Sequence, residues 1–164
     1  MRSILKVNWD SNLPIYAISQ SELQKKGIHS LLLDVDGTLV NRKSNMIPKA
    51  VKNWIIESKK IFSLYLISNN PSKKRIEKLA KELNLRYKYN ASKPRKKETL
   101  FVIKEIGIDT ENIAIIGDRI FTDIIVGNRC NIKTILVKRL NKDGLPIKFN
   151  LTLTIEKLIS RFLK

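Results

Sequence analysis

The stretch LLLDVDGTLV, residues 31–40, decides the fold class of this chain. Its leucines continue an apolar run that begins at Ile28, as expected for a short strand buried on both faces of a parallel sheet. Asp34 and Asp36 follow the run directly, and their spacing of two places both carboxylates on one side of an extended segment. Gly37 then allows a tight turn away from the strand. The stretch therefore predicts a buried strand that ends in two carboxylates.

The pattern of a short apolar run followed by a helical stretch repeats along the chain. The predicted strands are residues 28–33, 62–67, 85–89, 112–116 and 133–137. The predicted helices carry apolar residues at helical spacing: Val51, Trp54, Ile55 and Ile61 after Pro48; Ile76, Leu79, Ala80 and Leu83; Leu100, Ile103 and Ile106 before Gly107; and a last helix over 121–129. This alternation predicts an α/β fold, a three-layer Rossmann-like parallel sheet with helices on both faces. In such sheets ligands bind beyond the carboxyl ends of the strands.

Length and composition fit one such domain. The chain has 164 residues, of which 43% are hydrophobic, so it can bury a core of its own. We expect the domain over residues 28–164, with residues 1–27 as an N-terminal extension that packs on the core. The longest apolar runs have four residues, which predicts no membrane-spanning segment, and the amino terminus lacks a secretory signal. The single Cys130 indicates a reducing, cytoplasm-like compartment, or an organelle matrix such as that of a plastid in a eukaryote.

The chain is strongly basic, with 32 lysines and arginines against 15 acids and a net charge of +17. Such a charge attracts phosphate-bearing small molecules, nucleic acid or an anionic membrane. A lysine-rich composition from an AT-rich genome would give the same charge without any partner. Residues 71–97 carry eleven of the cations against two glutamates, which favours an anionic partner near that segment.

Aspartates are scarce, and their placement points to a metal site. Of the seven in the chain, four follow two of the predicted strands: Asp34, Asp36, Asp118 and Asp123. Neighbouring carboxylates repel each other unless a cation or a shared proton intervenes, and oxygen ligands of this kind suit Mg²⁺. Asp36 with the glycine after it also fits an ordinary turn, and Asp118 fits a helix N-cap. The apolar strand before Asp34 favours the metal site, because buried unpaired charge is costly.

Four segments in chain order resemble the motifs of the haloacid dehalogenase (HAD) superfamily of aspartate-dependent phosphatases. They are DVDGT at 34–38, Ser68 after the strand over 62–67, Lys93, and GDRIFTD at 117–123. Three more segments resemble the YqeG-type branch of subfamily IIIA, whose characterised members dephosphorylate phosphatidylglycerophosphate: ASKP at 91–94, GNR at 127–129 and TILV at 134–137. Asn131 departs from that pattern, which has glycine at this place.

The resemblance implies a Mg²⁺-dependent phosphomonoester hydrolase that works through an aspartyl-phosphate. Asp34 is then the nucleophile, and Asp36 the general acid and base. The implied metal ligands are Asp34, Asp36 through its backbone carbonyl, Asp118 and Asp123. Ser68, at a helix amino terminus, and Lys93 are implied to bind the phosphate, with Thr38 and Asn69 as further contacts.

Neither usual insertion point of the superfamily has room for a cap domain. Only 11 residues separate Asp36 from Pro48, and 24 separate Ser68 from Lys93. An open site suits a large or surface-bound substrate, or a homo-oligomer in which a neighbouring subunit closes it. We therefore favour phosphatidylglycerophosphate at a membrane surface. Another phosphate ester, such as a sugar phosphate or a nucleic-acid end, and a non-catalytic nucleic-acid-binding module are the alternatives.

The carboxyl-terminal segment and four isolated residues complete the predictions. Ile155, Leu158, Ile159, Phe162 and Leu163 form an apolar stripe beside Lys157, Arg161 and Lys164. A helix docked on the core is the simpler interpretation, and a helix lying on a membrane is the alternative. The residues interpreted as structural are His29, in the first strand, Cys130, Trp9 and Trp54.

Overall fold

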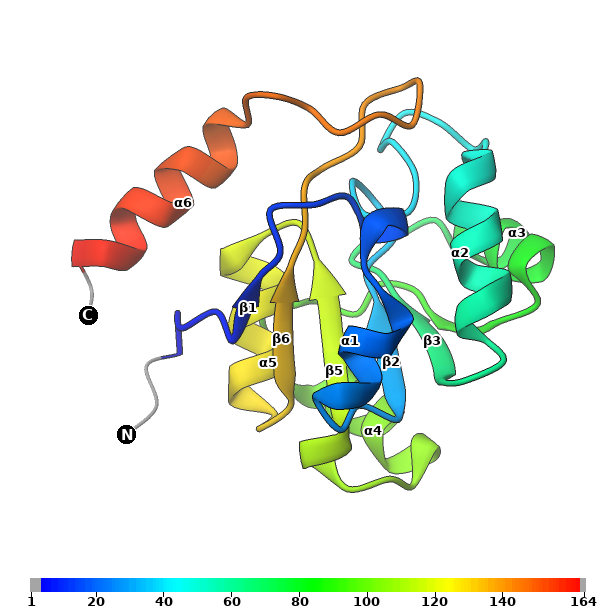
Figure 1. The fold of residues 1–164 in the computed structure, drawn as a ribbon, viewed down its shortest axis with the longest axis horizontal. Helices are drawn as coiled ribbons and strands as arrows, with labels where there is room; N and C mark the ends of the chain where they lie inside the picture. Colours follow the sequence, from blue (N-terminus) through cyan, green and yellow to red (C-terminus); the bar gives the residue numbers. More distant parts are fainter. Residues whose placement is uncertain (1–3, 163–164) are drawn as a thin grey trace.

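Six strands form one parallel sheet (Figure 1). The structure, a computed structural model, describes residues 4–162. The strands are β1 (Trp9–Asp10), β2 (Ser30–Leu33), β3 (Ser63–Ile67), β4 (Arg86–Lys88), β5 (Ile113–Gly117) and β6 (Lys133–Leu136). Their order in the sheet is β1-β6-β5-β2-β3-β4, and every pairing is parallel. The predicted α/β, Rossmann-like fold is confirmed.

Helices cover both faces of the sheet. The helical elements, of which α6 lies outside these two layers, are η1 (Ile15–Ala17), α1 (Gln20–Lys25), α2 (Lys49–Ser58), α3 (Lys73–Leu83), α4 (Lys97–Ile106), η2 (Thr110–Asn112), η3 (Ile120–Ile124), α5 (Ile125–Arg129) and α6 (Leu151–Phe162). Elements η1 and α1 to α3 share a core with Leu31 and Leu33 of β2, whereas α4 and α5 share one with Leu32. Successive side chains of β2 point to opposite faces, and both faces are covered, so all three leucines are buried.

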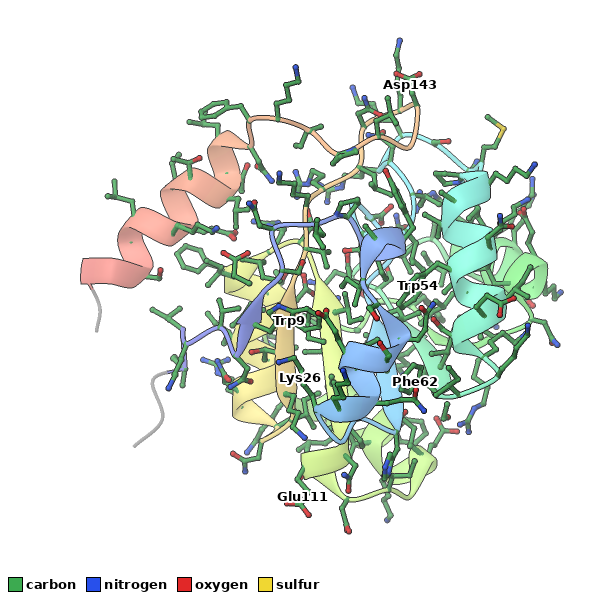
Figure 2. The ribbon with its side chains drawn as sticks, viewed as in Figure 1. Trp9, Lys26, Trp54, Phe62, Glu111 and Asp143 are labelled. Atoms are coloured by element: carbon green, nitrogen blue, oxygen red, sulfur yellow. The ribbon has the colours of Figure 1, made fainter. Side chains whose placement is uncertain are left out.

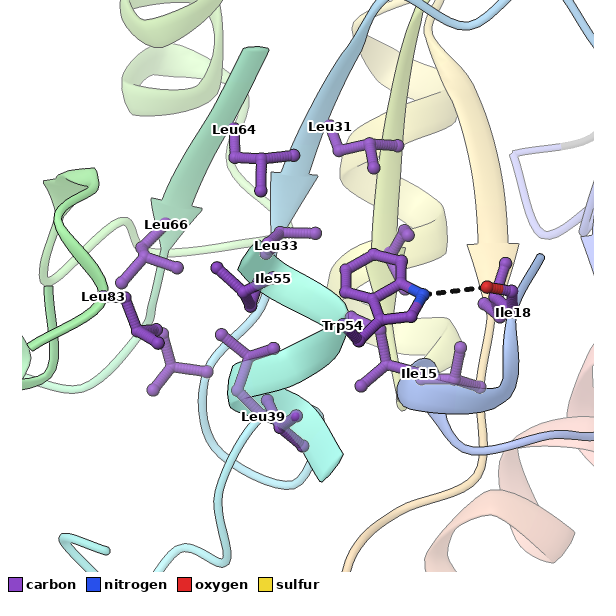
Figure 3. Packing of buried hydrophobic residues seen from close by; sticks show 14 of the residues in the cluster. Ile15, Ile18, Leu31, Leu33, Leu39, Trp54, Ile55, Leu64, Leu66 and Leu83 are labelled. Atoms are coloured by element: carbon purple, nitrogen blue, oxygen red, sulfur yellow. Dashed lines mark hydrogen bonds between the residues drawn. The ribbon is translucent and has the colours of Figure 1, made fainter. Parts of the chain in front are cut away.

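Trp54 anchors α2 on the first of these faces (Figure 3). Its indole is 5% exposed, and Nε1 donates to the carbonyl oxygen of Ile18 across 2.8 Å. The ring is therefore buried without an unpaired donor, in agreement with its interpretation as a packing residue. Trp9 is partly buried against the same core, and the ammonium of Lys26 lies 4.9 Å from its ring centroid (Figure 2).

Two segments form structure that the sequence pattern did not predict. Strand β1 has only two residues, too few for any periodicity, and its pairing with β6 is fixed by Asn8, whose Oδ1 accepts from the Thr134 N–H at 2.9 Å. The helix expected over 121–129 instead begins as the π-helical turn η3 and continues as α5. Such π turns are frequent at functional sites.

Three residues lie in other places than predicted. Helix α2 ends at Ser58, and Ile61 follows it in a turn, largely exposed. In α4, Ile103 and Ile106 pack on the core as predicted, but Leu100 is 40% exposed, and its place on the buried side is taken by Thr99. His29 precedes β2 and is exposed, although its backbone groups pair with Asn112 and Ser63.

The carboxyl ends of the strands carry short connections. Residues 34–48, between β2 and α2, form a loop, and the connection from β3 to β4 contains only α3. Within residues 4–162, neither insertion point therefore carries a cap domain. No helix of this described part is both long and apolar enough to cross a membrane.

Candidate active site

A pocket of about 270 Å³ lies where β2, β3 and β5 end. Seven of the eight predicted site residues line it: Asp34, Asp36, Ser68, Asn69, Lys93, Asp118 and Asp123. The eighth, Thr38, is fully buried behind Asp34, to whose Oδ2 its hydroxyl donates across 3.2 Å. Residues far apart in the sequence meet here because parallel strands end at one edge of the sheet.

Three buried carboxylates form the centre of the pocket. Asp34, Asp118 and Asp123 each offer an oxygen, and these oxygens lie within 4.8 Å of one another. Asp118 and Asp123 are each 1% exposed, and Asp34 is 7% exposed. Three anions this close in a buried site require positive charge nearby.

Lys93 supplies part of that charge. Its Nζ donates to Asp34 Oδ1 at 2.7 Å, to Asp123 Oδ1 at 2.6 Å and to the carbonyl oxygen of Ile67 at 2.8 Å. The three bonds use all the hydrogens of the ammonium group, and the residue is only 4% exposed. Most lysines lie at the protein surface, and without its place in the motif series this residue would be assigned there too. Its burial shows that it is part of the site.

Burial and crowding shift the pKa values of these groups. Burial raises the pKa of the Asp34 carboxyl to about 7 against the attraction of Lys93, and the charges of Asp123 and Asp118 add to the rise. Burial and Asp123 likewise raise the pKa of Asp118 to about 6, against the attraction of Arg139. Burial disfavours the charged form of Lys93, but Asp123 and Asp34 outweigh it and hold the pKa of the ammonium above its ordinary value. The cluster therefore accommodates further positive charge.

One oxygen of the cluster has no partner. Asp118 Oδ2 accepts from Arg139 Nε at 2.5 Å, whereas Asp118 Oδ1 is buried and makes no hydrogen bond within the described residues 4–162. A buried carboxylate oxygen without a partner is costly. Together with the neighbouring oxygens of Asp34 and Asp123, it forms a set of hard oxygen donors that fits a divalent cation such as Mg²⁺.

Two glycines allow the backbone to approach the acids. Gly37 has φ of +100°, and a Cβ at this position would lie 2.7 Å from Asp118 Oδ2. A Cβ at Gly117 would lie 2.3 Å from Asp123 Cγ. Both positions therefore require glycine on steric grounds, and in each motif the glycine makes room for a carboxylate.

Asn69 joins the loop after β3 to the loop that carries Lys93. Its Nδ2 donates to the carbonyl oxygen of Lys93 and its Oδ1 accepts from the Lys93 N–H, both at 2.7 Å. The side chain expected to contact phosphate is thus engaged in fixing the lysine. Ser68 is 1% exposed and its hydroxyl accepts from the Asn70 N–H at 3.1 Å. Helix α3 begins only at Lys73, so Ser68 lies in the preceding loop and not at the helix amino terminus as predicted.

The side chain of Asp36 points away from the acid cluster. Its Oδ1 accepts from Arg75 Nη1 at 2.7 Å, and its Oδ2 accepts from Asn70 Nδ2 at 2.9 Å. Arg75 also donates to the Ser44 carbonyl oxygen at 2.8 Å and to Asn45 Oδ1 at 2.9 Å. Asp36 therefore lines the pocket but is held by Arg75 and Asn70, separate from the carboxylates that could ligate a cation.

Three residues of the site lie outside the motifs on which the sequence prediction relied. They are Asn70 and Arg75, which hold Asp36, and Arg139, which binds Asp118. Asn70 directly follows Ser68 and Asn69, which is a weak signal. Nothing in the sequence pattern distinguishes Arg75 or Arg139 from the many other cations of the chain.

Comparisons with known proteins agree with this arrangement. The model of the mitochondrial PGP phosphatase family matches residues 2–140. The Bacillus subtilis (strain 168) protein named "Probable phosphatase YqeG" is 28% identical over 138 residues, which are 83% of this chain and 80% of that protein.

Solved structures share the fold. An uncharacterized protein from Listeria monocytogenes serotype 4b has a TM-score of 0.57 at 19% identity, covering 77% of this chain and 86% of its own. The HAD-hydrolase YfnB from Bacillus subtilis, bound to magnesium, has a TM-score of 0.55 at 13% identity, covering 84% of this chain and 99% of its own.

Proposed function

This chain belongs to the mitochondrial PGP phosphatase family and is a HAD-type phosphatase, and from this premise we propose that it hydrolyses phosphatidylglycerophosphate to phosphatidylglycerol and inorganic phosphate with the help of Mg²⁺. The alternative of a non-catalytic nucleic-acid-binding module is thereby wrong. A different phosphate ester as substrate is the remaining alternative, and it would use the same site.

The observation that carries the proposal is the position of Asp34. Its carboxylate lies in the pocket, is held by Lys93 and Thr38, and has two further carboxylates beside it. In the first step, an oxygen of Asp34 attacks phosphorus to form an O–P bond, and the bond from phosphorus to the alkoxide oxygen of the lipid breaks. Asp34 then carries the phosphoryl group as an aspartyl-phosphate.

Asp36 moves the protons in both steps. As the carboxylic acid it gives its proton to the departing alkoxide oxygen. As the carboxylate it then takes a proton from water, whose oxygen attacks phosphorus and releases inorganic phosphate from Asp34. Asp36 lines the same pocket as Asp34 and is not part of the acid cluster that could hold a cation, and both facts support this role.

The remaining residues stabilise negative charge. Asp34, Asp118 and Asp123 would hold the Mg²⁺, which supplies positive charge against the repulsion between the nucleophile and the phosphate. That YfnB is bound to magnesium supports the choice of ion. The ammonium of Lys93, which already donates to Asp34 and Asp123, would offset negative charge beside the nucleophile, and the Ser68 hydroxyl in the pocket is the candidate donor to an oxygen of the phosphoryl group.

A substrate panel tests the proposal. Phosphate release is measured with Mg²⁺ on phosphatidylglycerophosphate in anionic liposomes, and in parallel on an aryl phosphate, sugar phosphates and a 5′-phosphorylated oligonucleotide. We expect the highest kcat/KM for the lipid. Preference for one of the other esters would replace the lipid substrate while leaving the chemistry in place.

Two controls separate the chemistry from the substrate. Asp34→Asn is expected to abolish release of phosphate from every ester, and chelation of Mg²⁺ to do the same. Asp143→Asn is the matched control, because Asp143 is exposed and does not line the pocket (Figure 2). Activity that survives Asp34→Asn would exclude this residue as the nucleophile.

A further inference from the structure

Helix α6 docks on the protein by its polar side and exposes its apolar side. Leu151, Ile155, Leu158 and Ile159 follow helical spacing on one face, which we term the α6 apolar face, and they are 61%, 47%, 54% and 37% exposed. Glu156, by contrast, is 2% exposed. A helix that only covered the core would place these residues the other way round, so the predicted docking on the core by this stripe is wrong. The side chains of Arg161, Phe162, Leu163 and Lys164 lie outside the described part.

The docked side of α6 is fixed by specific contacts. Glu156 Oε2 accepts from the Ile120 N–H at 2.7 Å, and its Oε1 accepts from Nε and Nη2 of Arg119 at 3.2 Å each. Lys157 Nζ lies 2.6 Å from Asp10 Oδ2, and Leu153 packs against the small cluster around Ile120. Rotating α6 to bury its apolar face would break the pair of Glu156 with Arg119 and leave the buried Ile120 N–H without its acceptor, which is unfavourable.

Helix α6 is joined to the pocket through its docked side. Arg119 lines the pocket and is the residue that binds Glu156 of α6. In Figure 1, α6 lies at the edge of the molecule, outside the helical layers on the two faces of the sheet. Phe149, just before α6, is 71% exposed and extends the apolar surface. A surface that binds the α6 apolar face would therefore lie beside the site of phosphate release.

The charge around α6 selects an anionic partner. Its one acidic residue, Glu156, is buried in the ion pair with Arg119, so α6 presents no free carboxylate. Residues 138–164 carry seven lysines and arginines against two acids, and the whole chain has a net charge of +17. A second copy of the chain would bring the same positive charge against this face, whereas an anionic lipid surface would bring the opposite charge.

We propose that the α6 apolar face inserts into the interface of an anionic lipid membrane and so holds the pocket at the bilayer surface. An exposed apolar helix face in a basic segment is typical of helices that lie in the plane of a membrane interface. This inference rests on the proposed function, since it names the surface on which the lipid substrate is met.

Vesicle co-sedimentation tests the inference without any catalytic readout. The full chain is mixed with vesicles of equimolar phosphatidylglycerol and phosphatidylcholine, or of phosphatidylcholine alone. We expect binding to the anionic vesicles, and at least tenfold weaker partitioning for the double variant Ile155→Gln, Leu158→Gln, because burial of apolar area drives insertion. The matched control is Ile56→Gln, Ile61→Gln, which replaces two exposed isoleucines away from α6 and is expected to bind like the parent.

Vesicle binding is measured without substrate, so its result does not depend on which phosphate ester the enzyme hydrolyses. Glutamine keeps the helix propensity of α6 high, and thermal unfolding of each variant checks that it is folded; an Ile155→Ala, Leu158→Ala pair is measured alongside and should lose less binding. The inference is overturned if the parent does not bind anionic vesicles, or if the α6 variant binds as well as the control. It is also overturned if the parent is a dimer that the α6 variant makes monomeric without vesicle binding. Failure to hydrolyse phosphatidylglycerophosphate would change none of these measurements.

Discussion

Arg75 Nη1 lies 2.7 Å from Asp36 Oδ1, and this ion pair separates the second aspartate of the DVDGT segment from the first. The two carboxylates leave the same strand two residues apart, yet only Asp34 joins the buried acid cluster. Arg75 comes from the first turn of α3 and also binds the loop after β2, so it fixes where Asp36 can act. The division of roles between the two aspartates thus depends on a residue outside the motif.

Replacing Arg75 is expected to slow the reaction with little change in substrate binding. In Arg75→Met, Asp36 keeps its Asn70 hydrogen bond but loses the guanidinium that orients it. Because misplacement of a catalytic group lowers the rate, we expect kcat on an aryl phosphate to fall on the order of 10- to 100-fold, with KM nearly constant. Lys78→Met, an exposed position of the same helix, is the control. A rise in KM at unchanged kcat would instead assign Arg75 to substrate binding.

Gly37→Ala is expected to destabilise the protein by about 3 kcal/mol or more. The alanine Cβ would strain a backbone with φ of +100° and would also meet the Asp118 carboxylate. Gly107→Ala is the comparison, because Gly107 has φ of +69° with no atom within 4 Å of the added Cβ. We expect that variant to lose only about 1 kcal/mol. Chemical denaturation measures both, and equal losses would show that contact with Asp118 contributes nothing.

Mg²⁺ is expected to raise the thermal unfolding midpoint more at pH 8 than at pH 5.5. The cation binds carboxylates, and the pKa values of Asp34 and Asp118, raised by burial to about 7 and about 6, mean that both groups are largely protonated at pH 5.5. Binding must then displace protons, so the gain in stability shrinks as the pH falls through these values. Asp118→Asn should remove the increment and Asp143→Asn should keep it. An increment that is the same at both pH values would contradict a site built on these carboxyls.

Cys130 is expected to react slowly with thiol reagents in the folded protein. It is 3% exposed, and burial raises the pKa of its thiol to about 11. The reactive thiolate is therefore scarce at neutral pH and increases only as the pH approaches that value. Alkylation at pH 7.5, followed by mass spectrometry with and without denaturant, measures this. Rapid alkylation of the native protein would contradict the interpretation of Cys130 as a packed residue.

The sequence predicted the central strands well because a strand buried on both faces appears in the sequence as an apolar run. Strands β2, β3 and β5 fall within one or two residues of the expected ranges, since each is covered on both faces. Strand β1 was not predicted, because two residues are too few to show the alternation of apolar and polar side chains typical of a strand. Its pairing with β6 depends on the side chain of Asn8. The side of α6 that packs on the protein was also not predicted. The spacing of apolar residues shows that a helix has an apolar and a polar face, but not which of the two contacts the rest of the protein.

The site residues that directly follow strands could be predicted from the sequence. The residues that reach the site from helices and more distant loops could not. Asp34, Asp118 and Asp123 meet because β2 and β5 are neighbours in the sheet and end at the same edge, where the sequence predicted the site. Arg75 and Arg139 reach the acids from α3 and from the segment after β6, and no local pattern marks them. Asn69 had the position of a phosphate ligand, but its hydrogen bonds to the Lys93 backbone are tertiary contacts that sequence spacing does not show.

The most direct test of the account is chemical trapping of the phosphorylated enzyme. The protein is mixed with phosphatidylglycerophosphate and Mg²⁺, quenched in acid during turnover, and digested for peptide mass mapping. We expect one phosphoryl group on the peptide that contains residues 31–40, located on Asp34 and absent from Asp34→Asn. A phosphoryl group on any other residue, or undiminished turnover by Asp34→Asn, would contradict the assignment of Asp34 as the nucleophile.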